Sequence, residues 1–241
     1  MDLLPSNFFV LLIILHFSTL CQIDVLHFSI YYNILILNYG GVYMSIEISD
    51  FGNSENKLFT ITNSKGLIAK FTNYGAVLVS LFVPDKNGKL DDVVLGFDSL
   101  EKYSTNDCCY FGSTVGRNSN RVKNASFKLN DSIYNLDKNE RNKNNLHSGF
   151  NPYNKRTWDY KIDEKNNSIS FSLLSPDGDQ GFPGEFKITV TYTLTNDNSL
   201  KIEYNGISDK DTVANMTNHS YFNLAGHNSR NCDETNALYK L

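Results

Sequence analysis

The stretch that decides the fold is FKITVTYTLT, residues 186–195. Every second side chain in it is apolar, and the positions between are lysine or threonine. A period of two residues is typical of a strand that buries one face and exposes the other, as in antiparallel sheets. Asn196-Asp197-Asn198 has the composition of a turn and leads into a second apolar stretch, residues 200–204. The pattern therefore predicts two adjacent antiparallel strands.

Similar strands are predicted upstream. Residues 58–62 and 67–72 flank Asn63-Ser64-Lys65-Gly66, a hairpin-turn composition. Val77, Val79, Leu81 and Val83 stand at alternate positions before Pro84, and residues 85–88 (DKNG) form the next turn. No long amphipathic helix and no internal repeat or linker is found over residues 44–226, so the predicted class is all-β, a sandwich or barrel.

Composition narrows the class of function. The chain has 241 residues, a formal net charge of -4 and 41% hydrophobic residues, which suits one globular domain with a sizeable core. Mild acidity without a basic stripe predicts no nucleic-acid partner. The four cysteines have no CxxC spacing, so neither a zinc site nor a disulfide framework is indicated, and reduced thiols are predicted: Cys21, Cys108, Cys109 and Cys232.

The first 43 residues differ from the remainder and allow three interpretations. The apolar run at residues 8–17 suits the core of a signal peptide, but no Lys or Arg precedes Lys57, so the usual positive segment is missing. A membrane span is disfavoured because polar residues interrupt any run of the necessary length: His16, Gln22, Asp24 and His27. The third interpretation, which we favour, is that Met44 is the true start and residues 1–43 are an artefact of the gene model.

Residues 212–226 contain an unusual mixture of polar and apolar side chains that fits neither an ordinary strand nor an ordinary helix. His219 lies between two asparagines of this segment and is followed directly by Ser220 and Tyr221. These side chains offer hydrogen-bond donors and acceptors, so the cluster suits a ligand covered in hydroxyl groups. The alternative is a buried histidine satisfied by its neighbours.

Two other segments are rich in functional groups. In residues 111–121 (FGSTVGRNSNR), glycines permit tight turns, and Arg121 after Asn120 could present a fork of donors to sugar oxygens or a carboxylate. The alternative is a surface loop with solvated arginines. In residues 144–150 (NNLHSGF), His147 is predicted to lie exposed in a cleft, the alternative being a turn or core histidine. No third histidine or carboxylate stands at ligand spacing, so no metal site is predicted.

Residues 177–185 (DGDQGFPGE) alternate acidic residues and glycines. The order of acids found in an EF-hand calcium loop is absent, as are flanking helices. The segment is interpreted as a structured turn that leads into the strand beginning at Phe186.

Taken in order, five segments resemble the aldose 1-epimerase (galactose mutarotase) family. They are residues 92–97 (DVVLGF), 116–121 (GRNSNR), 145–149 (NLHSG), 178–184 (GDQGFPG) and 217–226 (TNHSYFNLAG). The resemblance covers residues 44–226, and it implies a large antiparallel β-supersandwich and the interconversion of α and β anomers of aldohexoses such as galactose and glucose.

The resemblance also implies roles for particular residues. His219 matches the general acid that protonates the ring oxygen of the sugar. Asn120 and Arg121 match the sugar-binding pair, and His147 matches the second histidine, which positions the substrate. Ser220 and Tyr221 belong to the same substrate-contacting segment. Opening a hemiacetal needs only proton transfers, for which histidine is suited, so no cofactor and no metal is expected.

The sequence departs from the family after Gly226. The family's general base is a glutamate well downstream of the histidine motif, and a substrate-contacting aspartate also lies there. Residues 227–241 no longer resemble the family, and nothing aligns Asp233 or Glu234 with the base. The expectation is therefore a partial domain with the acid half of the site, from a truncated or misassembled gene product with unpaired strand edges.

Other hypotheses stay open: a hexose-6-phosphate mutarotase, a non-catalytic carbohydrate-binding module, or a fragment with neither activity. The expected partner is a small sugar, with no stable membrane association. Asn215 and Asn218 begin glycosylation sequons, and a glycan on Asn218 would obstruct His219, so a cytoplasmic location is favoured. Secretion is the alternative, if residues 1–21 act as a signal peptide.

Overall fold

The computed structural model describes residues 8–16, 44–106 and 109–229, with only the backbone of 8–16. The interpretations of residues 1–7 and 17–43 lie outside the described residues, as do those of Cys21, Cys108, Cys232 and the tail beyond 229.

The strand predicted from FKITVTYTLT is the centre of a five-stranded antiparallel sheet with the order β1-β15-β14-β13-β12. Along β14 the apolar positions are buried and the positions between them are not, as the period of two predicts. Leu194 pairs with Leu200 across the turn, which confirms the second strand, although that strand extends further than predicted. The bounds are β1 (Phe8–His16), β12 (Asp159–Asp163), β13 (Ser168–Ser175), β14 (Phe186–Leu194) and β15 (Ser199–Ser208).

The second five-stranded sheet follows the chain order, β2-β3-β4-β5-β6. Its strands are β2 (Ser45–Asp50), β3 (Lys57–Thr62), β4 (Ile68–Thr72), β5 (Val77–Pro84) and β6 (Leu90–Asp92). Thr62 pairs with Ile68, so the turn predicted at residues 63–66 is confirmed. Asn63 organises this turn: its Oδ1 accepts from the Leu67 N–H at 2.8 Å, while its Nδ2 donates to the Thr195 carbonyl at 2.8 Å. One buried amide therefore joins the hairpin ends of the two sheets.

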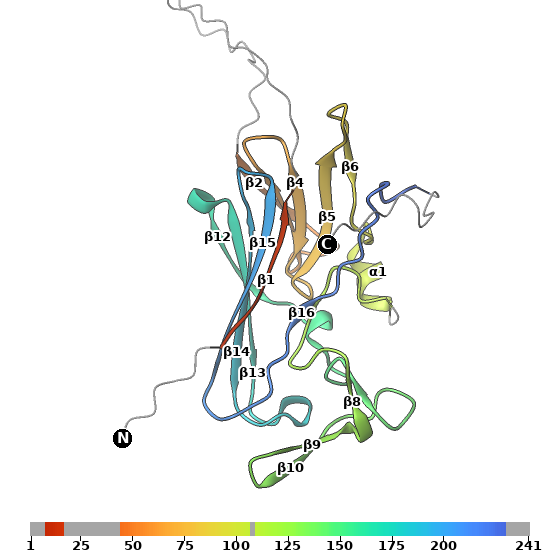
Figure 1. Ribbon diagram of the computed structural model, residues 1–241, viewed down its shortest axis with the longest axis vertical. Coiled ribbons are helices and arrows are strands. Elements are labelled where there is room, and N and C mark those ends of the chain that lie inside the picture. Colours follow the sequence, from red (N-terminus) through yellow and green to blue (C-terminus); the bar gives the residue numbers. More distant parts are fainter. Residues whose placement is uncertain (1–7, 17–43, 107–108, 230–241) are drawn as a thin grey trace, which may run out of the picture.

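The two sheets lie face to face and enclose the core (Figure 1). Phe59 and Phe71 of one sheet meet Phe171 and Tyr192 of the other, with ring centroids 5.6 Å apart for Phe59–Phe171 and 4.6 Å for Phe71–Tyr192. All four side chains are fully buried. The predicted all-β sandwich is confirmed.

Outside the sandwich the elements are short. The helix α1 (Leu100–Thr105) is capped at its N-terminus by Ser99, whose side chain accepts from the Lys102 N–H. Two-stranded ladders join β9 with β10, β8 with β11, and β7 with β16. Their bounds are β7 (Thr114–Val115), β8 (Arg121–Val122), β9 (Ser126–Leu129), β10 (Ser132–Asn135), β11 (Asn145–Leu146) and β16 (Thr217–Asn218). Within the described part of the chain, no helix is long and apolar enough to cross a membrane.

Candidate active site

Residues 113–122 form the backbone support of the candidate site. On one side, β8 pairs with β11, and the His147 N–H donates to the Asn120 carbonyl at 3.1 Å. On the other side, β7 pairs with β16, and the His219 N–H donates to the Ser113 carbonyl at 2.8 Å. This one segment therefore brings together two histidines that are far apart in the sequence.

Arg117 anchors this segment and is fully buried. Its Nη1 donates to the carbonyls of Pro183 and Gly184 at 2.7 and 2.9 Å, and its Nη2 donates to the Ser175 hydroxyl at 2.7 Å. The guanidinium also lies over the rings of Phe182 and Phe186. A solvated surface loop is therefore the wrong interpretation for Arg117, because its donors are satisfied by inward-facing oxygens of the 175–184 region.

The acidic and glycine-rich stretch at residues 177–185 is a structured turn, as interpreted from the sequence. Arg156 donates to both oxygens of Asp179, at 2.7 and 2.9 Å, and the Ser175 hydroxyl donates to the same carboxylate at 2.5 Å. Burial would raise the pKa of Asp179, but the hydrogen bonds from Arg156 and Ser175 outweigh it and hold that pKa below the ordinary value. Both oxygens of the Asp179 carboxylate therefore accept hydrogen bonds from Arg156. No cluster of metal-ligating side chains occurs among the described residues.

His147 is held by Asn120 in a defined protonation form. The Asn120 N–H donates to Nδ1 of His147 at 3.1 Å, so Nδ1 is an acceptor and the ring proton is on Nε2. Burial, followed by the nearby His219 and Arg121, lowers the pKa of His147 from 6.5 to about 4, so the ring is neutral near pH 7. The residue is only 8% exposed, so the expectation of an exposed imidazole is wrong. Its backbone pairing with residue 120 draws the ring inward.

His219 differs from His147. It is half-buried, and within the described residues the hydrogen bonds that hold it are made by its backbone and not by its ring. Besides the bond to Ser113, the Gly112 N–H donates to the His219 carbonyl at 3.3 Å. Neither ring nitrogen has a hydrogen-bond partner among the residues that the structure describes. The alternative of a buried histidine satisfied by its neighbours therefore does not describe His219.

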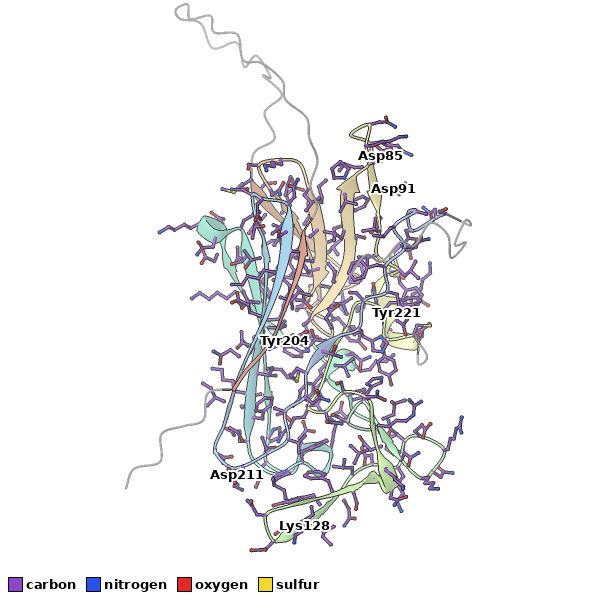
Figure 2. All side chains as sticks on the ribbon, in the orientation of Figure 1. Asp85, Asp91, Lys128, Tyr204, Asp211 and Tyr221 are labelled. Carbon is purple, nitrogen blue, oxygen red and sulfur yellow. The ribbon has the colours of Figure 1, made fainter. Side chains whose placement is uncertain are left out.

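Both imidazoles open into one pocket of about 510 Å³. All six residues predicted from the sequence line it: Asn120, Arg121, His147, His219, Ser220 and Tyr221. Ser119, Thr217 and Asn218 complete the lining. Tyr221 is 45% exposed on the segment that follows β16 (Figure 2).

Two of the pocket's polar side chains are preorganised by partners outside it. Arg121 donates through Nε to Glu140 at 3.2 Å, which leaves its other nitrogens available to the pocket. Hydrogen bonds from Asn144 and then Arg121 hold the pKa of Glu140 below its ordinary value, so the carboxylate stays ionised. The Ser220 hydroxyl donates to Oδ1 of Asn218 at 2.5 Å.

Asn218 was missed as a lining residue, although it is adjacent to His219 in the same motif. Its Nδ2 donates to the Gly112 carbonyl at 2.9 Å and to the Tyr192 hydroxyl at 3.1 Å. Tyr192 belongs to β14 and donates in turn to the Ala76 carbonyl at 2.8 Å. The buried hydroxyl of Tyr192 therefore links the sandwich core to Asn218 in the pocket wall.

Tyr110 was also missed as a residue of the site, because the sequence around it has no pattern that indicates a binding role. Its ring centroid lies 4.5 Å from the His147 ring and 5.6 Å from the His219 ring. The two imidazole centroids are 5.3 Å apart and nearly perpendicular, at 83°. Tyr110 therefore contacts both histidines.

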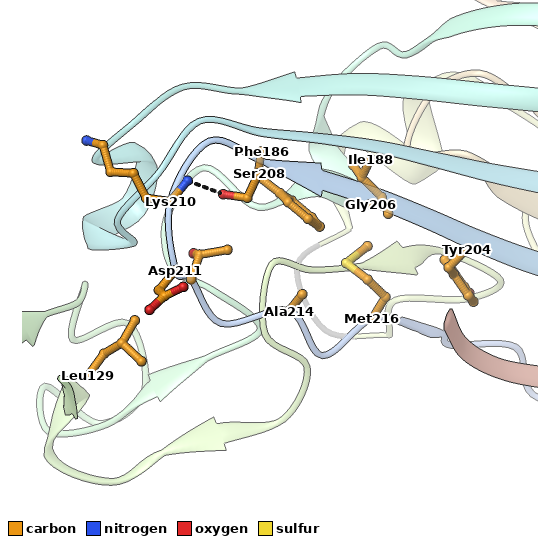
Figure 3. Close-up of a pocket in the computed structure, with 11 residues that line it drawn as sticks. Leu129, Phe186, Ile188, Tyr204, Gly206, Ser208, Lys210, Asp211, Ala214 and Met216 are labelled. Atoms are coloured by element: carbon orange, nitrogen blue, oxygen red, sulfur yellow. Dashed lines mark hydrogen bonds between the residues drawn. The ribbon is translucent and has the colours of Figure 1, made fainter. Parts of the chain in front are cut away.

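A second cavity, of about 520 Å³, lies between the β14–β15 face and the chain that follows β15 (Figure 3). Its walls are largely apolar and include Phe186, Ile188 and Met216, with Lys210 and Asp211 toward one end. It contains no histidine and none of the predicted site residues. A hydroxyl-rich ligand needs convergent hydrogen-bonding groups, so the histidine pocket is the better candidate.

Comparisons with known proteins show which proteins this chain is similar to. The family model described as Aldose 1-epimerase matches residues 57–238. Aldose 1-epimerase of Haemophilus influenzae is 46% identical over 168 residues, covering 70% of this chain and 48% of that protein. Galactose mutarotase of Rattus norvegicus is 43% identical over 157 residues, covering 65% of this chain and 44% of that protein. The chain spans about half the length of the curated relatives it matches.

Solved structures show the same relationship. Galactose 1-epimerase from Lactobacillus acidophilus superposes with a TM-score of 0.67 at 29% identity, over 76% of this chain and 54% of that one. The aldose epimerase homologue from C. elegans superposes with a TM-score of 0.65 at 37% identity, over 70% of this chain and 51% of that one.

Proposed function

Because the chain belongs to the aldose 1-epimerase family, we propose that its histidine pocket takes an aldohexose such as galactose or glucose and takes part in interconverting its α and β anomers. The observation that carries the proposal is that both histidines, Asn120 and Arg121 line one open pocket. The pocket walls combine imidazole, guanidinium, amide, hydroxyl and phenol groups, which suit a ligand with a hydroxyl on almost every carbon.

In the proposed reaction, the imidazolium of His219 gives its proton to the ring oxygen while the bond between that oxygen and C1 breaks. The anomeric hydroxyl loses its proton to a second group, and its O–H electron pair forms the carbonyl of the open-chain aldehyde. Rotation about the C1–C2 bond then presents either face of the aldehyde, and the reverse transfers close the ring. His219 suits the donor role because its ring nitrogens have no other hydrogen-bond partner among the described residues.

The other histidine would bind rather than transfer protons. With Nδ1 occupied by the Asn120 N–H, the neutral ring of His147 can offer only its Nε2–H, which suits the oxygen of a sugar hydroxyl. A pKa of about 4 keeps the His147 ring neutral at neutral pH. The guanidinium nitrogens of Arg121 that do not contact Glu140 would donate to further sugar oxygens.

Among the described residues that line the pocket, none is a carboxylate that could accept the proton of the anomeric hydroxyl. Glu140 lies behind Arg121, and its lowered pKa makes it a weak base. This observation favours a second candidate function, sugar binding with little turnover, because losing one member of a proton-transfer pair typically costs about 10²–10⁴ in rate.

A phosphorylated hexose is a less suitable ligand than a free one. Arg121 is the only lysine or arginine that lines the pocket among the described residues, and it already shares its charge with Glu140. A phosphate group would require more positive charge than this pocket offers.

Polarimetry on freshly dissolved α-galactose, with isothermal titration of the same sugar, tests the proposal. We expect sugar binding and catalysed mutarotation by the parent chain, and a rate loss of about 10²–10⁴ in His219→Ala with binding retained. His227→Gln is the matched control because His227 contacts the Val94 carbonyl outside the pocket. Binding without turnover in the parent would favour the binding module, and absence of both would refute the proposed function. Galactose 6-phosphate in place of galactose tests the choice of ligand.

A further inference from the structure

Tyr110 lies against both histidines of the pocket, but its own backbone conformation is unusual. Its φ is 50°, in the left-handed region that residues with a β-carbon seldom adopt. Such conformations persist where the surrounding structure determines them, and they gather at functional sites. The ring of Tyr110 is therefore held at a defined place beside the pocket.

Hydrogen bonds join the turn that begins at Tyr110 to the backbone of His219. The Tyr110 carbonyl accepts from the Ser113 N–H at 3.1 Å, and the Ser113 carbonyl accepts from the His219 N–H at 2.8 Å. The Gly112 N–H donates to the His219 carbonyl at 3.3 Å, and the backbone at Gly112 passes so close to Leu78 that an added β-carbon would lie 1.9 Å from its carbonyl oxygen. The turn at residues 110–113 is therefore rigidly placed relative to His219.

The imidazole of His219 has no comparable tether. His147 is oriented by the hydrogen bond at its Nδ1, whereas the ring nitrogens of His219 have no partner in the described part of the chain. Ring contacts are what orient it: Tyr110 at 5.6 Å, His147 at 5.3 Å and Tyr221 at 5.2 Å between centroids. Tyr221 is itself 45% exposed, so it is a weak restraint, whereas Tyr110 is half-buried and also touches His147.

We propose that Tyr110 is a positioning residue whose ring holds the imidazole of His219 at a fixed orientation to His147. This inference rests on the proposed function, and it adds a residue that acts through the proton donor without acting on the sugar. The aromatic ring is the part of this side chain that contacts both imidazoles. A donor held in line with its acceptor is worth a large factor in rate, and a displacement of about 1 Å can cost 10²-fold.

Two substitutions separate the ring from the rest of the side chain. Tyr110→Phe keeps the ring, so we expect kcat within about threefold of the parent, whereas Tyr110→Leu removes it, so we expect kcat to fall about 10- to 100-fold with KM nearly unchanged. Phe150→Leu is the control, because Phe150 is 72% exposed and lines a neighbouring cavity with Tyr110 but not the histidine pocket. Tyr110→Met replaces Tyr110→Leu if the leucine variant does not fold by circular dichroism.

Nitrogen-15 NMR of the histidine side chains gives a readout independent of turnover. We expect the His219 ring signals to move in Tyr110→Leu and to stay in place in Tyr110→Phe, with the Nε2–H form of His147 retained in both. If the parent shows neither sugar binding nor mutarotation, the proposed function fails, while the NMR comparison still tests the ring restraint. Unchanged His219 signals in Tyr110→Leu, or equal damage from Tyr110→Phe, would overturn the proposal.

Discussion

The sandwich and the histidine pocket are built in opposite ways. In the sandwich, strands run to ten residues, and β14 buries every second side chain along its length. Around the pocket the ladders are two residues long, and Asn120, His147 and Ser148 all have positive φ. The regular part derives its stability from repeated apolar contacts, and the irregular part from individual hydrogen bonds. Substitutions in the two regions should therefore fail in different ways.

The largest effect is expected in the sandwich, at Phe171. Its fully buried ring contacts those of Phe59 and Tyr192 across the two sheets. Phe171→Ala should lower the free energy of unfolding by about 3–5 kcal/mol, because it removes a large apolar side chain and leaves a cavity. Leu174→Ala in the same strand is the control: Leu174 is 55% exposed, and its change should stay within about 0.5 kcal/mol. Urea unfolding measures both, and similar losses would contradict this view of the core.

The second largest loss of stability is expected at Arg117, which anchors the segment that carries Asn120 and Arg121. Arg117→Met should lower the free energy of unfolding by roughly 3 kcal/mol, because buried carbonyls of Pro183 and Gly184 lose a charged donor. Arg121→Met is the matched control, since the Arg121 side chain is 55% exposed. It should change stability little and weaken galactose binding in titration. A stability loss of equal size at both positions would show that the distinction between anchor and site is wrong.

These two positions also show what the sequence could and could not predict. Alternation in residues 186–195 was sufficient for β14, since strand geometry repeats and one face must be buried. Arg117 and Arg121 lie four positions apart in one polar segment, and nothing in composition separates the buried one from the exposed one. The difference arises from the 175–184 region, whose oxygens meet Arg117 only in the folded chain.

The same limit explains the histidines. The resemblance indicated that Asn120, Arg121, His147 and His219 share a site, and they line one pocket. The depth of His147 depends on its pairing with Asn120, which local sequence does not encode. Tyr110 was missed because it lies between Cys109 and Phe111, where the sequence carries no polar pattern, and its ring contacts are with residues distant in the sequence.

A smaller effect is expected from acid. The folded chain holds His147 with a pKa of about 4 against the ordinary 6.5, so between these pH values the unfolded chain binds a proton that the folded chain excludes. Stability from His147 is present above pH 6.5 and is lost as pH falls toward 4, by roughly 1–2 kcal/mol once partial solvent access to the ring is allowed for. The test is the difference in unfolding free energy between the parent and His147→Gln at pH 7 and pH 4.5. All other titrating groups are common to both chains, so equal slopes would contradict the assignment.

The smallest effect is expected where the two regions meet, at Tyr192. Tyr192→Phe removes the hydroxyl that links β14 to Asn218. Both of its partners keep another hydrogen bond: Asn218 still donates to the Gly112 carbonyl, and the Ala76 carbonyl still accepts from the Thr114 hydroxyl at 3.0 Å. Since no buried group is orphaned, the loss of unfolding free energy should be about 1 kcal/mol, that of one hydrogen bond. Galactose affinity, measured by titration, should fall less than it does in Arg121→Met. If Tyr192→Phe instead abolished sugar binding and left stability unchanged, the core would be controlling the pocket through this hydroxyl, and the sandwich and the site could not be treated as separately built regions.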